Sequence, residues 1–118
     1  MDYYRCKWPP HLSQRDDTVA AYMDGLNDTY SPVGALAEEI AALRAAHPNT
    51  PVISFSHFVP RLSLNPEKRF LFNPALAKAC GSSWLRRRVD QLRPDMHIFG
   101  HTHFGWDATI DDIRYVHA

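Results

Sequence analysis

Hydrophobic positions in the first half of the chain follow a helical period in two successive segments. After the acidic start Asp16-Asp17, apolar residues stand at the i, i+3, i+4 and i+7 positions of one helix face, namely Val19, Tyr22, Met23 and Leu26. A second helix is predicted from Ser31-Pro32, a capping residue followed by proline at the first helical position, and Pro48 ends it. We therefore predict two consecutive helices before residue 50.

Two short apolar runs have the composition of buried strands, and a histidine follows each of them. Residues 52–55 lie between Pro51 and Pro60 and lead into Ser56-His57. Residues 96–99 lead into Gly100-His101-Thr102-His103. Between the two runs, Ser82 begins a third predicted helix that Pro94 closes. Alternating helices and strands are typical of an α/β fold, in which ligands gather at the carboxyl ends of the strands.

The remaining segments complete a single predicted domain. Alternating apolar residues over 106–110 and 113–117, on either side of Asp111-Asp112, predict a β-hairpin. Residues 59–80 read as a long connection, a kind of segment that is usually functional in a compact domain. We expect residues 1–15 to be an irregular lead-in and residues 16–118 to form the α/β core.

The histidines after the two strands are candidate metal ligands. On an extended backbone His101 and His103 would point to the same side, and Gly100 would let the chain leave the strand sharply. With His57 they would place three imidazoles at one sheet edge, a donor set that suits a borderline-soft divalent metal. The alternatives are a pair of surface histidines at 101 and 103 and a structural histidine at 57.

These two elements resemble the motifs of the calcineurin-like metallophosphoesterases. The elements are Ser-His-x-x-Pro at 56–60 and, some forty residues later, Gly-His-Thr-His at 100–103. The resemblance covers the chain from about residue 51 onward, and it implies two metal ions at the carboxyl edge of a sheet sandwich. It implies that His57 and His101 ligate one ion and His103 the other, with a bridging hydroxide as the nucleophile. Two ions about 3.5–4 Å apart stabilise both the attacking oxygen and the phosphoryl charge.

The chain also departs from that family's pattern. It contains no Gly-Asp and no Asn-His dipeptide, which in the family supply a bridging aspartate, an asparagine ligand and a further imidazole. Asp95-Met96-His97 spells the family's Asp-x-His, but it lies on a later strand, where we expect both side chains to cap or pack. The resemblance thus implies the C-terminal half of an αββα sandwich without its N-terminal strands. It also implies one or two weakly held divalent ions, such as Mn, Fe or Zn.

The long connection carries three basic residues that we consider as phosphate contacts. Arg61, Lys68 and Arg69 follow the first candidate ligand, and their charges complement a phosphate ester. Solvated loop charges are the alternative, because basic side chains are commonly exposed.

The composition argues against some classes of partner but does not identify a substrate. Thirteen basic and thirteen acidic residues give a formal charge of zero, which leaves no nucleic-acid or membrane footprint. Cys6 and Cys80 match no Cys-x-x-Cys pattern, so a reduced compartment is expected. The chain shows neither a signal-peptide core nor a membrane span, which favours a cytoplasmic location.

Three functions stay open at this stage. The first is a metal-dependent phosphoesterase acting on a small phosphate ester or a phosphoprotein, incomplete and weakly active or inactive alone. The second is a non-catalytic metal-binding module with a single ion held by His57, His101 and His103. The third is a structural or interaction remnant of the fold. An incomplete sheet would expose an edge and an apolar face, so we also expect a completing chain or self-association.

Overall fold

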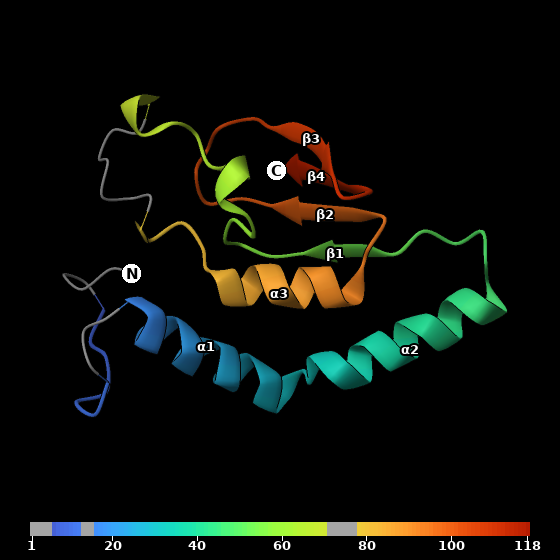
Figure 1. Cartoon of the computed structure of the whole chain (residues 1–118), viewed down its shortest axis with the longest axis horizontal. Helices are drawn as coiled ribbons and strands as arrows, with labels where there is room; N and C mark the ends of the chain where they lie inside the picture. The colour runs from blue at the N-terminus through green and yellow to red at the C-terminus, as the bar shows by residue number, and fades with distance from the viewer. Residues whose placement is uncertain (1–5, 13–15, 71–77) are drawn as a thin grey trace.

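The computed structural model describes residues 6–12, 16–70 and 78–118, which form three α-helices and one four-stranded sheet (Figure 1). The helices are α1 (Asp16–Tyr30), α2 (Val33–Ala46) and α3 (Ser83–Leu92). The strands are β1 (Ile53–Phe55), β2 (Met96–Phe99), β3 (Asp107–Ile110) and β4 (Ile113–His117), and two short 3₁₀ turns, η1 (Leu62–Leu64) and η2 (Lys68–Phe70), follow β1. The predicted helices, strands and hairpin are confirmed.

The sheet is mixed, with the strand order β1-β2-β4-β3. β1 pairs with β2, and β2 with β4, in parallel, whereas the hairpin partner β3 runs antiparallel to β4. Because β1 and β2 run in the same direction, their carboxyl ends lie at one edge of the sheet. This topology is what brings the two histidine motifs together.

One face of the sheet carries the core. Phe99 of β2 and Tyr115 of β4 are fully buried there, together with Ile113. Val89 of α3 packs on them, and so do three buried residues of the segments that flank α3 and β1, namely Val59, Leu64 and Cys80. The predicted long connection therefore closes one side of the core rather than lying free of it.

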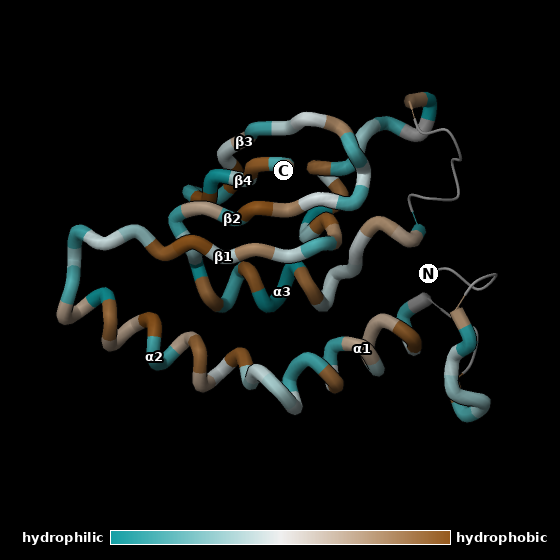
Figure 2. Tube along the Cα trace, turned by 180° about the vertical axis from the view of Figure 1, so that it is seen from behind, coloured by the Kyte–Doolittle hydropathy of each residue, from teal (hydrophilic) through white to brown (hydrophobic). Residues whose placement is uncertain are grey.

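The opposite face of the sheet is open. Register places Ile53 beside Met96 and Phe55 beside Ile98, so these four apolar side chains share one face. Phe55 is 83% exposed, and Ile53 is also exposed. Figure 2 shows the hydrophobic character of β1 and β2. Met96 and Ile98 are half-buried, and no described element covers the two exposed side chains.

The three helices lie on the same side of β1. α3 is next to β1, and α1 and α2 contact α3 on the side that faces away from β1 (Figure 1). Arg88 of α3 fastens α1 through ion pairs of 3.4 Å to Asp24 and 3.1 Å to Asp28. Arg44 of α2 pairs at 3.2 Å with Asp95, which lies in the segment after α3. Charged side chains therefore attach the outer helices to the core.

The start of α2 differs from the prediction. The helix has Pro32 at its N-cap position, and the Ser31 side chain does not cap it. The Val33 N–H instead donates to the Asp28 carboxylate at 3.0 Å, a hydrogen bond that also lowers the pKa of Asp28. Asp28, five residues before Val33, therefore caps α2. It can do so because α1 continues to Tyr30 and brings Asp28 next to the start of α2.

The start of α3 agrees with the prediction and reveals a tight contact just before it. Ser82 accepts a hydrogen bond from the Leu85 N–H at 3.2 Å, the expected N-cap. Gly81 forms a parallel bridge with Val59, and a Cβ built on Gly81 would lie 1.8 Å from the Val59 carbonyl oxygen. Only glycine lets the two backbones approach this closely.

The observed fold is thus mixed α/β, as predicted at that level. No helix of the described residues is long and apolar enough to cross a membrane.

Candidate metal centre

His57 and His101 meet where β1 and β2 end. The Nε2 atom of His57 lies 2.9 Å from the Nδ1 atom of His101, and the ring centroids are 4.9 Å apart. His57 is exposed and His101 half-buried, so the pair is open to solvent on one side. Two of the three predicted ligands are therefore brought into contact from positions 44 residues apart.

The backbone around this pair is tied together by continued strand pairing. The Ser56 N–H donates to the Ile98 carbonyl at 3.0 Å, and the Gly100 N–H donates to the His57 carbonyl at 3.2 Å. These two bonds extend the parallel ladder beyond β1, so each histidine leaves the sheet from a fixed backbone position. The pairing of the strands thus accounts for the pairing of the imidazoles.

The backbone of the Gly-His-Thr-His segment is not extended, which corrects the predicted geometry. His101 and His103 have φ values of 76° and 59°, both in the left-handed region. Gly100 has no positive φ, and a Cβ there would lie 3.6 Å from the His57 carbonyl oxygen, an ordinary contact. The chain therefore turns at the histidines and not at Gly100. The prediction that His101 and His103 point to the same side required extended backbone at both residues, and their positive φ values rule that out.

His103 lies near the pair without joining it. Its side chain is exposed, and its charge contributes to lowering the pKa of His101. Burial is the largest cause of that lowered pKa, followed by the charges of His57 and then His103. Among the described residues, no group of three histidine, cysteine or acidic side chains stands close enough to hold a metal ion. Joint ligation by three histidines stays a prediction.

The two nitrogens of the pair fit one metal ion as neighbouring ligands. Nitrogens about 2.0–2.1 Å from the same ion lie about 2.9 Å apart when they subtend a right angle. The 2.9 Å separation of His57 Nε2 and His101 Nδ1 equals that right-angle value, whereas the tetrahedral angle of zinc sites would place the two atoms about 3.3 Å apart. Both atoms must be free of hydrogen to bind, so binding would replace their hydrogen bond, and the ring that donates it would carry its hydrogen on the other nitrogen. The described residues thus place two candidate ligands next to each other.

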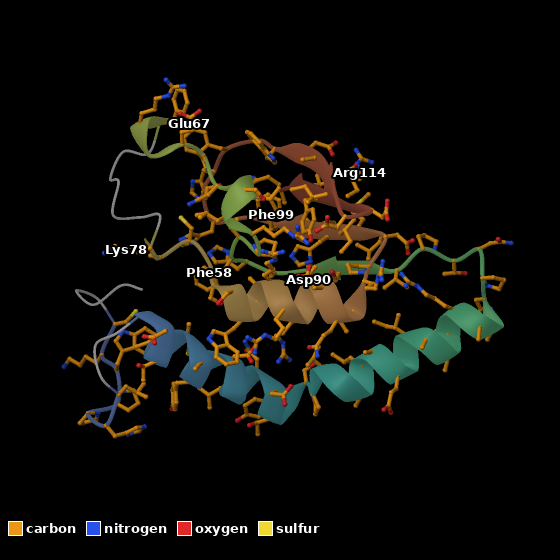
Figure 3. The ribbon with its side chains drawn as sticks, viewed as in Figure 1. Phe58, Glu67, Lys78, Asp90, Phe99 and Arg114 are labelled. Carbon is orange, nitrogen blue, oxygen red and sulfur yellow. The ribbon has the colours of Figure 1, made fainter. Side chains whose placement is uncertain are left out.

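A third aromatic ring borders the pair. The ring of Phe58 lies 5.1 Å from that of His57 and 4.9 Å from that of His101, measured between centroids. Figure 3 places Phe58 near the N-terminal end of α3. Phe58 therefore forms an apolar wall beside the imidazoles, a role that nothing in the spacing of the motifs had indicated.

His97 belongs to the core, as expected for the Asp-x-His at 95–97. It is 1% exposed, and its two ring nitrogens lie 2.7 Å from Ser54 Oγ and 3.0 Å from Ser56 Oγ. Ser56 donates its only hydroxyl hydrogen to the Phe58 carbonyl at 2.7 Å, so Ser56 must accept from His97 Nε2–H. Nδ1 then accepts from Ser54. Burial lowers the pKa of His97 to about 4, which keeps the ring neutral.

Asp95 likewise has a structural role. Its carboxylate accepts the Val52 N–H at 2.7 Å and pairs with Arg44. The Val52 hydrogen bond, followed by Arg44, holds the pKa of Asp95 below its usual value despite some opposition from burial. The expected role in capping and packing is therefore confirmed for both Asp95 and His97.

Arg61 is buried and pairs with two carboxylates that are exposed to solvent. Its guanidinium is 8% exposed, pairs with Asp90 at 2.9 Å and Asp111 at 2.7 Å, and donates to the Tyr115 hydroxyl at 3.1 Å. Burial alone would lower the pKa of Arg61, but the two carboxylates outweigh it and raise that pKa above its usual value. A phosphate would have to compete with these two carboxylates for Arg61. Contact between Arg61 and a substrate therefore stays a prediction, and its ion pairs are the structural alternative.

The other two basic residues considered for phosphate contact lie around η2. Arg69 is 70% exposed and pairs with Glu67 at 2.9 Å, away from the histidine pair. Lys68 falls within η2, but its side chain lies outside the described part of the structure.

Sequence reasoning missed the polar partners of His97 and of Arg61. Ser54 and Ser56 alternate within an apolar strand, and two polar residues at i and i+2 indicate a polar partner on that face. That signal was present in the sequence. Asp90 and Asp111 gave no comparable signal, because only the tertiary fold brings them to Arg61.

No family model, no curated protein and no solved structure matches the chain.

Proposed function

We propose that the chain carries the nitrogen half of a metal centre that hydrolyses phosphate esters. The observation that carries the proposal is the 2.9 Å contact between His57 Nε2 and His101 Nδ1 at the ends of adjacent parallel strands. The motif order Ser-His-x-x-Pro and Gly-His-Thr-His, which resembles the calcineurin-like metallophosphoesterases, supports the reaction class. A calcineurin-like sandwich completed by a second segment or chain is part of this proposal.

In this proposal the chain's own histidines bind the metal ions. A divalent ion, when bound, supplies Lewis-acid polarisation of a phosphoryl oxygen and an acidified water. His57 and His101 hold that ion in their unprotonated forms, and the lowered pKa of His101 favours this form near neutral pH. His103 is close enough for its charge to act on His101 and is proposed to bind a second ion. The remaining ligands are proposed to be carboxylates of the segment or chain that completes the sandwich.

Metal content is the direct test. We expect about one Zn²⁺ or Mn²⁺ per chain after equilibrium dialysis and elemental analysis, and loss of that ion in His57→Ala and His101→Ala. His47→Ala is the matched control, because His47 is an exposed histidine at the end of α2. Equal metal content in all four proteins would contradict the proposed centre.

Activity separates the two functions that involve metal. With bound Mn²⁺ or Zn²⁺ we expect slow release of p-nitrophenol from its phosphate mono- or diester, abolished by His101→Ala and unchanged by His47→Ala. A chain that binds the ion through His57 and His101 but hydrolyses neither ester is the non-catalytic metal-binding module.

A further inference from the structure

We propose that a cleft between α1 and α3 binds the aromatic or flat apolar part of the phosphate ester; this substrate class rests on the proposed function. The cleft has a volume of about 300 Å³, and His57 stands at its edge. That volume is at the lower end of the range typical of small-molecule sites. The phosphate would then lie at the histidine pair and its organic group in the cleft.

The walls of the cleft are large and apolar. They come from the N-terminal segment, α1, the end of β1 and α3, and their main side chains are Trp8, Met23, Phe58, Trp84 and Leu85. Two of the chain's three tryptophans are thus in one cleft, whereas Trp106 lies just before β3 and is not part of the lining. Such aromatic walls favour a flat ring, which stacks without leaving gaps.

The two charged side chains of the cleft lining, Asp24 and Arg88, pair with each other. Arg88 pairs with Asp24 and Asp28 and also donates to the Ser31 carbonyl. A second anion or cation would have to displace one of these partners. The cleft is therefore suited to a neutral group, and the phosphate charge is left to the metal centre.

One polar atom in the cleft lining lacks a partner within the described residues. The indole N–H of Trp8 is buried and makes no hydrogen bond there. The segment that carries Trp8 packs against α1 through an edge contact of His11 with Tyr22, 6.1 Å between ring centroids. A buried donor without an acceptor is costly, so an acceptor on the bound group, such as a ring oxygen, would be favoured.

Phe58 connects the cleft to the chemistry. Its ring lines the cleft and also contacts both His57 and His101 at about 5 Å between centroids. Ser56 and His57, at the end of β1, line the same end of the cleft. An ester bound with its ring in the cleft would therefore present its phosphate beside the two imidazoles.

The test measures binding to the metal-free chain by tryptophan fluorescence and by ligand-observed NMR. The compounds are 1-naphthol, 1-naphthyl phosphate and inorganic phosphate. We expect both naphthyl compounds to quench the fluorescence and inorganic phosphate to leave it unchanged. Met23→Lys should weaken naphthol binding at least tenfold, since it places a charge in the apolar lining. Trp106→Phe should retain the quenching.

A matched variant controls for general damage to α1. Leu26 is 39% exposed and Met23 is 37% exposed, both on α1, but Leu26 does not line the cleft. We expect Leu26→Lys to bind naphthol as the parent chain does. Absence of naphthol binding, or equal binding by the Met23→Lys and Leu26→Lys proteins, would overturn the proposal.

A histidine variant outside the cleft lining distinguishes this proposal from the proposed function. His101 does not line the cleft, so His101→Ala should leave 1-naphthol binding within about twofold and abolish the gain in naphthyl phosphate affinity that Zn²⁺ confers. Naphthol binding without any effect of Zn²⁺ on the ester would support an aromatic cleft and remove the phosphoesterase. A Zn²⁺-dependent gain for inorganic phosphate and naphthyl phosphate alike, without naphthol binding, would support the metal centre and remove the cleft.

Discussion

Arg61 and Tyr115 are joined by a hydrogen bond of 3.1 Å from the guanidinium Nε to the phenol oxygen. This contact links the segment after His57 to the central strand β4. Asp90 of α3 and Asp111 of the β3–β4 turn bind the same guanidinium, so one side chain joins three parts of the fold.

Replacing Arg61 with methionine should therefore be strongly destabilising. The substitution takes a hydrogen bond from the fully buried Tyr115 hydroxyl and leaves Asp90 with Arg86 as its ion-pair partner, and we expect a loss of about 2–3 kcal/mol in the free energy of unfolding. Urea unfolding measures it. Arg69→Met is the control, since its exposed pair with Glu67 should contribute less than about 0.5 kcal/mol. Similar losses in the two variants would show that the network does not stabilise the fold.

Replacing glycine with alanine should change the free energy of unfolding in opposite directions at Gly81 and at Gly25. Gly81→Ala should destabilise the protein by at least about 2 kcal/mol, because the new methyl group would overlap the Val59 carbonyl. Gly25→Ala, in the middle of α1 with open space around it, should stabilise by about 1 kcal/mol. Thermal unfolding of both variants decides this, and a stable Gly81→Ala protein would mean that the Val59–Gly81 bridge is dispensable.

The buried His97 predicts a loss of stability in mild acid. Its pKa is about 4 in the folded chain and about 6.5 when unfolded, so the unfolded chain binds the extra proton first. The stability is fully present above about pH 6.5 and falls toward pH 4, by roughly 3 kcal/mol in all.

Urea unfolding at pH 7, 6, 5 and 4.5 measures this dependence. His97→Gln removes the titrating group, so the slope of unfolding free energy against pH should become shallower over that window. His101, whose pKa is also lowered, contributes in the same direction and accounts for part of the slope that remains. An unchanged slope in His97→Gln would contradict a neutral buried His97.

The open sheet face predicts a contrast between two phenylalanines. Phe55→Lys should change the unfolding free energy by less than about 0.5 kcal/mol, because Phe55 is on the open face. Phe99→Ala should cost about 3–5 kcal/mol, because Phe99 is in the core. If copies associate through the open face, sedimentation velocity should show Phe55→Lys shifted toward monomer at high concentration. A large loss of stability in Phe55→Lys would mean that this face is covered.

Much of the fold was predictable because local signals and tertiary structure agree. Proline and serine marked the ends of the helices, and the apolar runs before His57 and Gly100 marked β1 and β2. The contact between His57 and His101 followed from one rule, that parallel strands share a carboxyl edge.

What escaped prediction depends on long-range contacts. The left-handed backbone at His101 and His103 and the carboxylate partners of Arg61 arise from how segments meet, and no local pattern encodes them. The capping of α2 by Asp28 was missed because the length of α1 decides which residue reaches Val33. The metal complement and the reaction stay predictions.

The attachment of the outer helices has a consequence for the order in which the chain opens. None of the fourteen residues of α2, which the structure describes in full, is buried. Among the described side chains of α1, only Val19 and Ala20 are buried. Amide hydrogens in α1 and α2 should therefore exchange with solvent well before those of β2 and β4, through partial openings that leave the sheet intact. Because α1 forms one wall of the cleft, a molecule bound there should slow hydrogen exchange in a helix remote from the sheet.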